Sequence, residues 1–342
     1  MKPNRILIPV LIILVLSAAC APVPASLEPT DFPATPILDP TETPPPTKSP
    51  LPLDTPVPTQ TSAPTAKPTP LGSGSGQILF SSNRGGSYDD LYLLDIGGSH
   101  VTRLTEGDSN TFAGPFSPDG KQILFTGFGL LHSYVGLMSA DGTDPVDLTK
   151  LPDSDEADPA WSPDGTQIVF TSRRDGNNEI YAMNADGSDP KRLTNSLKDD
   201  FDPAWSPDGE LIAFVSDRDN ETGINNLYLM NADGSDVKRL TQGSQIDYAP
   251  SWSPDGEWIA FRSHHDGPAD IYLIRPDGSD LQNLTENPSE DWAPTWSPDG
   301  EWIAFQSDRD GNWEIYVINI DGSGLLNLSN DSADDQMQYW RP

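Results

Sequence analysis

The sequence predicts an all-β fold, a six-bladed β-propeller of four-stranded antiparallel blades, and a tandem repeat is the first reason. The tetrapeptide SPDG occurs five times between residues 117 and 300, at intervals of 44 to 47 residues. A repeat of about 40–50 residues is the length of one propeller blade. The second reason is that each period carries the same parts in the same order.

Each repeat begins with an aromatic residue before SPDG and continues with an apolar run such as IVF at 168–170. A polar turn of the RDG kind, a second apolar run, a turn of the ADGS kind and a Leu-Thr or Leu-Ser pair follow. β-branched and aromatic residues favour strands, and Asp-Gly and Pro-Asp pairs favour tight turns. Each repeat therefore predicts four strands. The recurring Trp161, Trp205, Trp252 and Trp296 are interpreted as wedges between blades.

The two chain ends predict how the ring closes. The Leu-Thr or Leu-Ser pair occurs six times, whereas SPDG occurs five times. The chain ends in QYWRP, in which Trp340 and Pro342 match the W-S-P of the other repeats, and the first repeat begins directly with its second strand at Gln77. We therefore expect the C-terminal strand to dock into the first blade, which leaves only short edges.

The pattern PxWSPDGxxIAFxSxRDGxxEIYxMNADGSxxxxLT resembles the repeat of the TolB-type propellers over residues 77–342. It is also similar to the propeller domains of tricorn and prolyl-oligopeptidase proteins. The resemblance implies a propeller that serves as an interaction platform in the bacterial envelope, although this fold also hosts peptidase gates and sugar lyases. Full TolB proteins carry an N-terminal α/β domain, where this chain has a proline-rich segment, so a direct Tol–Pal role is not implied.

Residues 1–20 are predicted to be an export signal. Lys2 and Arg5 precede an apolar run, and small residues lead to Cys20, the single cysteine. This ending resembles a bacterial lipobox, with Ser17 where Leu is usual, and it predicts lipidation of Cys20. The protein is then an exported, membrane-anchored lipoprotein on a periplasmic or extracellular face. The alternative is an ordinary cleaved signal with an incidental cysteine.

Residues 21–76 are predicted to be a disordered stalk and hinge. Pro and Thr dominate this segment, which ends in GSGSG, and no apolar periodicity is present. Such a composition buries too little apolar surface to offset its ordering entropy. The stalk would hold the propeller, residues 77–342, away from the membrane.

The charge of the chain excludes one class of partner. Four of the 20 basic and five of the 52 acidic residues precede residue 77, so the propeller carries 47 acidic and 16 basic side chains. Nucleic acid is not expected, because phosphate binding requires a basic patch. A solvated acidic surface, a basic partner and divalent cations remain open.

One constellation predicts a binding site at the mouth of the propeller channel. An acid stands five residues before the aromatic in five repeats, and an aromatic often follows it. The acids are Glu156, Asp200, Asp247, Asp291 and Asp335, and the aromatics are Phe112, Phe201, Tyr248 and Trp292. This set suits a protein or basic peptide of the envelope, or else Ca²⁺. The alternative is that the acids pair with the turn arginines Arg84, Arg174, Arg218 and Arg309.

Signals for catalysis are absent from the sequence. It contains neither HExxH nor GxSxG, and its four histidines have no metal-ligand spacing. We assign no catalytic residue, metal ligand or cofactor, and predict a monomeric, non-catalytic binding platform. A carbohydrate-binding or carbohydrate-cleaving propeller and a structural cell-surface spacer are the alternatives. Residues 127–139 depart most from the repeat, and a contact patch there is a hypothesis.

Overall fold

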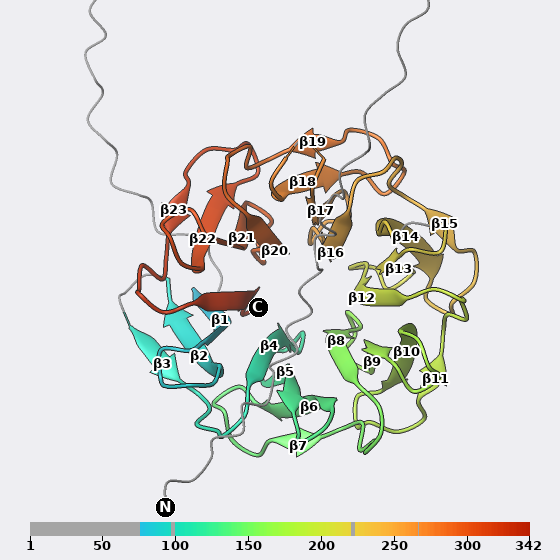
Figure 1. Cartoon of the computed structure of the whole chain (residues 1–342), viewed down its shortest axis with the longest axis horizontal. Helices are drawn as coiled ribbons and strands as arrows, with labels where there is room; N and C mark the ends of the chain where they lie inside the picture. The colour runs from blue at the N-terminus through green and yellow to red at the C-terminus, as the bar shows by residue number, and fades with distance from the viewer. Residues whose placement is uncertain (1–75, 97–99, 220–222, 266) are drawn as a thin grey trace, which may run out of the picture. The chain divides into compact units, whose positions relative to one another are not determined.

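The computed structural model describes residues 76–96, 100–219, 223–265 and 267–342. These residues belong to one compact unit, Pro64–Pro342, and within the described ranges they form 24 strands and no helix. The strands pair into six four-stranded antiparallel sheets that surround a common centre (Figure 1). The predicted six-bladed propeller is therefore confirmed. The predicted signal, Cys20 and the stalk up to residue 75 lie outside the described residues.

Each blade contributes one strand to each of four rings around the centre. The innermost strands are β4 (Thr111–Phe116), β8 (Glu156–Trp161), β12 (Asp200–Trp205), β16 (Asp247–Trp252), β20 (Asp291–Trp296) and β24 (Asp335–Trp340). The second strands are β1 (Gln77–Ser82), β5 (Gln122–Phe128), β9 (Gln167–Ser172), β13 (Leu211–Ser216), β17 (Ile259–Ser263) and β21 (Trp302–Ser307). The third strands are β2 (Asp90–Asp95), β6 (Ser133–Ser139), β10 (Glu179–Asn184), β14 (Asn226–Asn231), β18 (Asp270–Ile274) and β22 (Glu314–Asn319). The short outer strands are β3 (Val101–Arg103), β7 (Val146–Asp147), β11 (Lys191–Arg192), β15 (Lys238–Arg239), β19 (Gln282–Asn283) and β23 (Leu326–Asn327).

The C-terminal strand closes the ring, as predicted. The first blade has the strand order β24-β1-β2-β3, and Trp340 of β24 pairs with Ile78 of β1. Beyond β24, the Arg341 N–H donates to the Gln77 carbonyl at 2.9 Å. The ends of the propeller are thus joined within one sheet, so the edge of β1 is covered.

The SPDG motif forms the turn between the innermost and second strands. In the third blade, the Ser162 hydroxyl donates to Asp164 Oδ1 at 2.7 Å and accepts from the Gln167 N–H at 2.9 Å. Gly165 adopts a φ of 70°, a conformation that glycine reaches without steric cost. The Ser-to-Asp bond recurs in the other four SPDG turns, which explains why the motif is kept in the repeat.

The Leu-Thr pair anchors the outer strand to the third strand. The Thr194 hydroxyl accepts a hydrogen bond from the Ile180 N–H at 2.9 Å and donates to Glu179 Oε2 at 2.6 Å. In all six blades a hydroxyl at this position accepts from a backbone N–H of the third strand, and these hydroxyls belong to Thr105, Thr149, Thr194, Thr241, Thr285 and Ser329. The Leu-Thr or Leu-Ser pair that ends each repeat therefore supplies a hydroxyl that accepts a hydrogen bond from the third strand.

The core lies between neighbouring blades. In one cluster, Leu124 of β5 packs with Trp161 and Ile168 of the next blade. The indole N–H of Trp296 donates to the Ser251 carbonyl of the preceding blade at 3.0 Å. The recurring tryptophans thus act as wedges between blades, as the sequence predicted.

A bulge interrupts each innermost strand and turns its third residue. Five such residues have left-handed φ values of 50–53°, namely Asp158, Asp202, Ala249, Ala293 and Met337. The ladder to the second strand shifts register around this residue in five blades, and one residue later, between Ala113 and Phe116, in the second blade. Asp158 and Met337 are exposed although they lie on innermost strands, so solvent reaches the centre of the ring.

Candidate functional site at the centre of one face

The five predicted acids occupy the first position of their innermost strands, on the side of the ring that we call the entry face. The entry face carries the starts of the innermost strands and the turns between the second and third strands. Every one of the five carboxylates is buried, with at most 2 % of the residue exposed. Four pair with the turn arginine of their own blade, as Glu156 does with Arg174 at 2.8 Å. All five are buried and do not form an open acidic ring, and pairing with the turn arginines describes four of them.

The turn arginines are held by three kinds of contact at once. Arg174 Nε donates to Ser172 Oγ at 2.7 Å, and its guanidinium lies 4.4 Å from the ring centre of Tyr181. The same acid, serine and tyrosine surround the arginine in three further blades, at Arg84, Arg218 and Arg309. A planar guanidinium suits this combination of a fork and a stack. We call this arrangement the arginine module.

Two blades lack the complete arginine module. In the second blade, Thr111 and Gly127 replace the acid and the serine, and the ring of Tyr134 lies where a side chain at Gly127 would stand. In the fifth blade, Asp247 remains buried and accepts from Ser263 Oγ at 2.6 Å. There His265 lies against Tyr272, with ring centres 5.8 Å apart, in place of an arginine stack.

Three of the four predicted aromatics lie in one row across three blades. Phe201 and Tyr248 have ring centres 5.9 Å apart, and Trp292 lies 4.7 Å from Trp313. Arg262 connects the two pairs, since its guanidinium carbon lies 4.9 Å from Tyr248 and 4.0 Å from Trp292. We call these five half-buried side chains the aromatic–arginine row. Phe112 lies apart from it and packs edge-on against Phe128 at 5.3 Å.

Arg262 is a functional candidate that the sequence analysis missed. It occupies a second-strand position where the other blades have Ser81, Thr126, Thr171, Val215 and Gln306. Among the described residues it forms no ion pair, and its buried Nε has no hydrogen-bond partner. Burial lowers the pKa of Arg262, and the charges of Tyr248, Glu290 and Asp202 oppose that shift. The signal in the sequence was a long, positively charged side chain at a position where the other blades have uncharged side chains.

Two further carboxyls face one another near the same centre. Asp158 accepts from the Thr171 hydroxyl at 2.9 Å, and the Thr171 hydroxyl accepts from the Asp202 N–H at 3.3 Å. Desolvation by the surrounding protein at the centre of the ring raises the pKa of both groups, and the charge of Asp158 raises that of Asp202 further. Burial and both carboxylates also raise the pKa of Tyr339. The sequence signal was Asp at a position where two other blades have Ala249 and Ala293.

The divergent turn of the second blade exposes two leucines on the entry face. A bond from the Gly129 N–H to the His132 carbonyl at 2.9 Å closes the turn, whose tip is Leu130 and Leu131. These side chains are 103 % and 83 % exposed, respectively. The turn is therefore a second apolar feature of this face, and the contact patch predicted within 127–139 stays a hypothesis.

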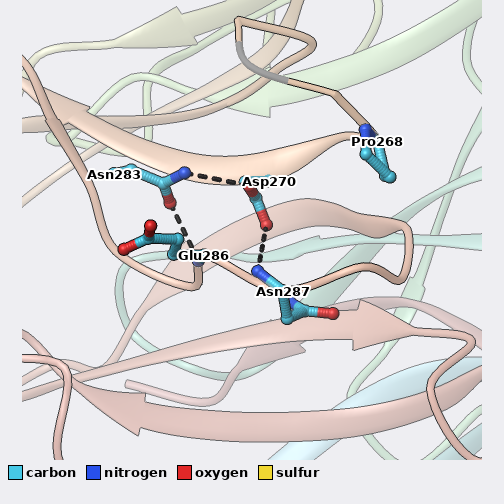
Figure 2. A pocket seen from close by; sticks show the side chains of 5 residues that line it. All are labelled: Pro268, Asp270, Asn283, Glu286 and Asn287. Atoms are coloured by element: carbon cyan, nitrogen blue, oxygen red, sulfur yellow. Dashed lines mark hydrogen bonds between the residues drawn. The ribbon is translucent and has the colours of Figure 1, made fainter.

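A pocket of about 440 Å³ lies at the rim of the fifth blade, lined by Pro268, Asp270, Asn283, Glu286 and Asn287 (Figure 2). Hydrogen bonds join several of its polar groups to one another. Asp270 accepts from Asn283 Nδ2 at 2.9 Å and from the Asn287 N–H at 3.2 Å. These bonds tie β18 to the segment after β19, so the pocket walls are structural.

The described part of the chain shows neither a metal-binding cluster nor a membrane-spanning helix. Over these ranges, no group of three His, Cys, Asp or Glu side chains is arranged to hold a metal ion. A helix with the length and apolar character needed to cross a membrane is likewise absent from the described residues.

Solved structures of other proteins share this fold. TolB from Acinetobacter baumannii superposes with a TM-score of 0.68 at 23 % identity, over 79 % of this chain and 68 % of that one. A protein from Agrobacterium tumefaciens described as a TolB gives 0.62 at 24 % identity, over 79 % and 95 %. Oligogalacturonate lyase from Vibrio parahaemolyticus gives 0.52 at 17 % identity, over 75 % of each chain. Identities this low show a shared fold alone.

The sequence itself also matches a known family. No curated protein matches the chain. The family described as the TolB β-propeller domain matches residues 146–246 and 245–342, more than half of the chain. The chain therefore belongs to the TolB β-propeller domain family.

Proposed function

We propose that this protein is a non-catalytic binding platform of the bacterial envelope that holds a protein or peptide partner at the centre of its entry face. The aromatic–arginine row is the observation that carries the proposal. Aromatic side chains and arginine are enriched at protein interfaces, where they supply most of the binding energy. The row is half-buried, spans three blades and lies close to Asp202, which acts electrostatically on both Tyr248 and Arg262.

The predicted acids take an indirect part in this proposal. Four of them pair with the turn arginines of their own blades, namely Glu156, Asp200, Asp291 and Asp335. In the fifth blade, which has no turn arginine, Asp247 accepts a hydrogen bond from Ser263. A partner would contact Tyr248, Trp292 and Phe201, and these carboxylates would fix the loops around them. The net negative charge of the propeller favours a partner with a basic surface, by long-range attraction.

We further propose that a lipid on Cys20 anchors the protein to a membrane and that residues 21–76 form its stalk. A mature N-terminal peptide that begins at Cys20 and carries acyl chains, measured by mass spectrometry, would support the anchor. A Cys20→Ala variant should then move to the soluble fraction. An unmodified Cys20 in mature protein from the native host contradicts this part of the proposal.

The partner site is tested by affinity capture with full-length protein from membranes of the native host. The test variant is Trp292→Ser, which removes one ring from the Arg262 stack. Its control is Trp258→Ser, because Trp258 stacks on Arg275 at 4.1 Å at the opposite end of the fifth blade.

The capture experiment has three informative outcomes. We expect a partner that native protein and the control retain and that Trp292→Ser loses. If native protein, the control and Trp292→Ser are all folded and capture the partner equally, the proposed site is wrong. The exposed Leu130 and Leu131 would then be the next residues to test. If no protein is captured and a glycan array binds, the carbohydrate alternative replaces the proposal.

A further inference from the structure

We propose that Arg262 is the contact point of an anion subsite in the aromatic–arginine row and that this subsite takes one carboxylate of the bound partner. The inference rests on the proposed function, because it names the chemical group through which a peptide or loop is recognised. The expected ligand is a basic peptide segment that contains one acidic side chain or a free C-terminus.

The first argument is the missing counterion of Arg262. The other four entry-face arginines described above each pair with a buried acid of their own blade. Arg262 pairs with no carboxylate of the described chain, and its buried Nε donates to nothing. A desolvated guanidinium without a counterion is unfavourable, so an incoming carboxylate would gain more here than at an exposed arginine.

The second argument is that Arg262 is held in place before any ligand arrives. Its guanidinium lies between Tyr248 and Trp292, at 4.9 and 4.0 Å, and its Nη2 is 2.8 Å from His264 Nε2. The Trp292 ring is itself fixed, since its N–H donates to Glu290 Oε2 at 3.0 Å. Stacking occupies the faces of the guanidinium and leaves its edge for hydrogen bonds. Fixing the group in advance lowers the entropy lost on binding.

The third argument selects a carboxylate over a phosphate. Glu290 lies close enough for its negative charge to act on Arg262, although the two side chains do not pair. Nearby negative charge opposes a phosphate of about −1.5 to −2 more strongly than a carboxylate of −1. The remainder of the ligand meets an acidic propeller, so a segment with compensating Lys or Arg residues fits best.

The fourth argument is that the fold does not require an arginine here. The equivalent residues of the other blades are small, apolar or uncharged. Gln306 occupies this position in the sixth blade, where its Oε1 accepts from the Met337 N–H at 2.9 Å. Arg262→Gln is therefore a substitution that the architecture already accommodates, and it removes the charge together with the stacked guanidinium.

The test is a selection of random peptides on immobilised full-length protein, repeated with Arg262→Gln and with Arg173→Gln. Arg173 is exposed and has no acid partner in the described chain, so its variant has the same net charge as the test variant. We expect native protein and Arg173→Gln to select basic peptides with one enriched Asp or Glu, and Arg262→Gln to lose that enrichment. The affinity of one selected peptide should fall about 10-fold or more in Arg262→Gln.

A thermodynamic cycle completes the test. Changing the enriched acid of the peptide to its amide should weaken binding to native protein and leave binding to Arg262→Gln unchanged. Selected peptides without acid enrichment, or an enrichment that survives Arg262→Gln, overturn the subsite while the proposed function stands. Failure to select any peptide counts against the proposed function. Binding of an oligouronide with no peptide selected would retain the carboxylate contact and overturn the peptide as its source.

Discussion

At the scale of single residues, the arginine module explains why acids recur at the start of the innermost strands. Glu156 is fully buried, accepts from Ser154 and Ser172, and pairs with Arg174. Such a pair contributes little compared with an apolar replacement, but removing one partner leaves a buried charge uncompensated. The second blade follows this rule, because it replaces the acid, the serine and the arginine together.

Arg174→Ala should therefore destabilise the propeller by about 2–4 kcal/mol, since Glu156 would lose its buried counterion. Arg173→Ala removes the adjacent exposed arginine and should change the free energy of unfolding by less than about 0.5 kcal/mol. Urea unfolding of the two variants measures the difference. Equal stabilities would show that the module does not hold the entry face together.

Asp202 predicts a pH dependence of stability with a definite sign. Because its pKa is raised in the folded state, the native protein binds a proton that the unfolded chain releases above about pH 4. Its contribution is therefore most favourable at low pH and is lost as pH rises towards the raised pKa. The groups that face it are Asp158, Arg262, Tyr248 and Tyr339.

Asp202→Asn keeps a carbonyl oxygen for the Ala249 N–H and removes this titration. The fall in melting temperature between pH 5 and pH 8 should be smaller in the variant than in native protein. Asp164→Asn is the control, because hydrogen bonds from Ser162 and Thr166 lower the pKa of Asp164, so it is ionised throughout that range. An unchanged pH dependence in Asp202→Asn would contradict a raised pKa at Asp202.

At the scale of elements, the short outer strands depend on one hydroxyl each. Strand β11 has only two residues, and Thr194 supplies the additional bonds that tie the following segment to β10. Two-residue strands have too few ladder bonds to be stable alone. The repeated threonine therefore compensates for the short edge.

Thr194→Val retains the shape of the side chain and should cost about 1–3 kcal/mol, because the Ile180 N–H and Glu179 would each lose a buried partner. Thr102→Val is the matched control on outer strand β3, since Thr102 is exposed. Hydrogen exchange should become faster at Ile180 in the first variant alone. Unchanged exchange there would mean that the hydroxyl is dispensable.

At the scale of the whole molecule, closure by β24 converts a linear array into a ring. Deleting residues 335–342 removes the innermost strand of the first blade and exposes the edge of β1. We expect the truncated protein to unfold at lower denaturant concentration and to self-associate through that edge. A truncated protein that stays monomeric and unfolds with native cooperativity in size-exclusion and urea experiments would contradict the role of closure.

Much of this architecture could be predicted because the same sequence pattern recurs from blade to blade. The SPDG turns, the Trp wedges and the closure at Trp340 all follow from periodic residues whose physical roles are local. The burial of Glu156 and of the four equivalent acids could not be predicted from the repeat. The repeat shows which position in the blade a residue occupies, but it does not show how deeply that position is buried. Arg262, Asp158 and Asp202 were missed for the opposite reason, since they are exceptions to the period.

The central claim is that a partner binds at the centre of the entry face, and site-specific photo-crosslinking tests it most directly. A photoreactive phenylalanine analogue would replace Ala157, the third-blade residue at the strand position that Phe201, Tyr248 and Trp292 occupy in the next three blades, in full-length protein within native cells. The same analogue at Glu210, exposed beside the SPDG turn on the opposite side, is the control. The account predicts one discrete crosslinked partner from position 157, none from position 210, and its loss with Trp292→Ser. A crosslink from position 210 alone would contradict the account.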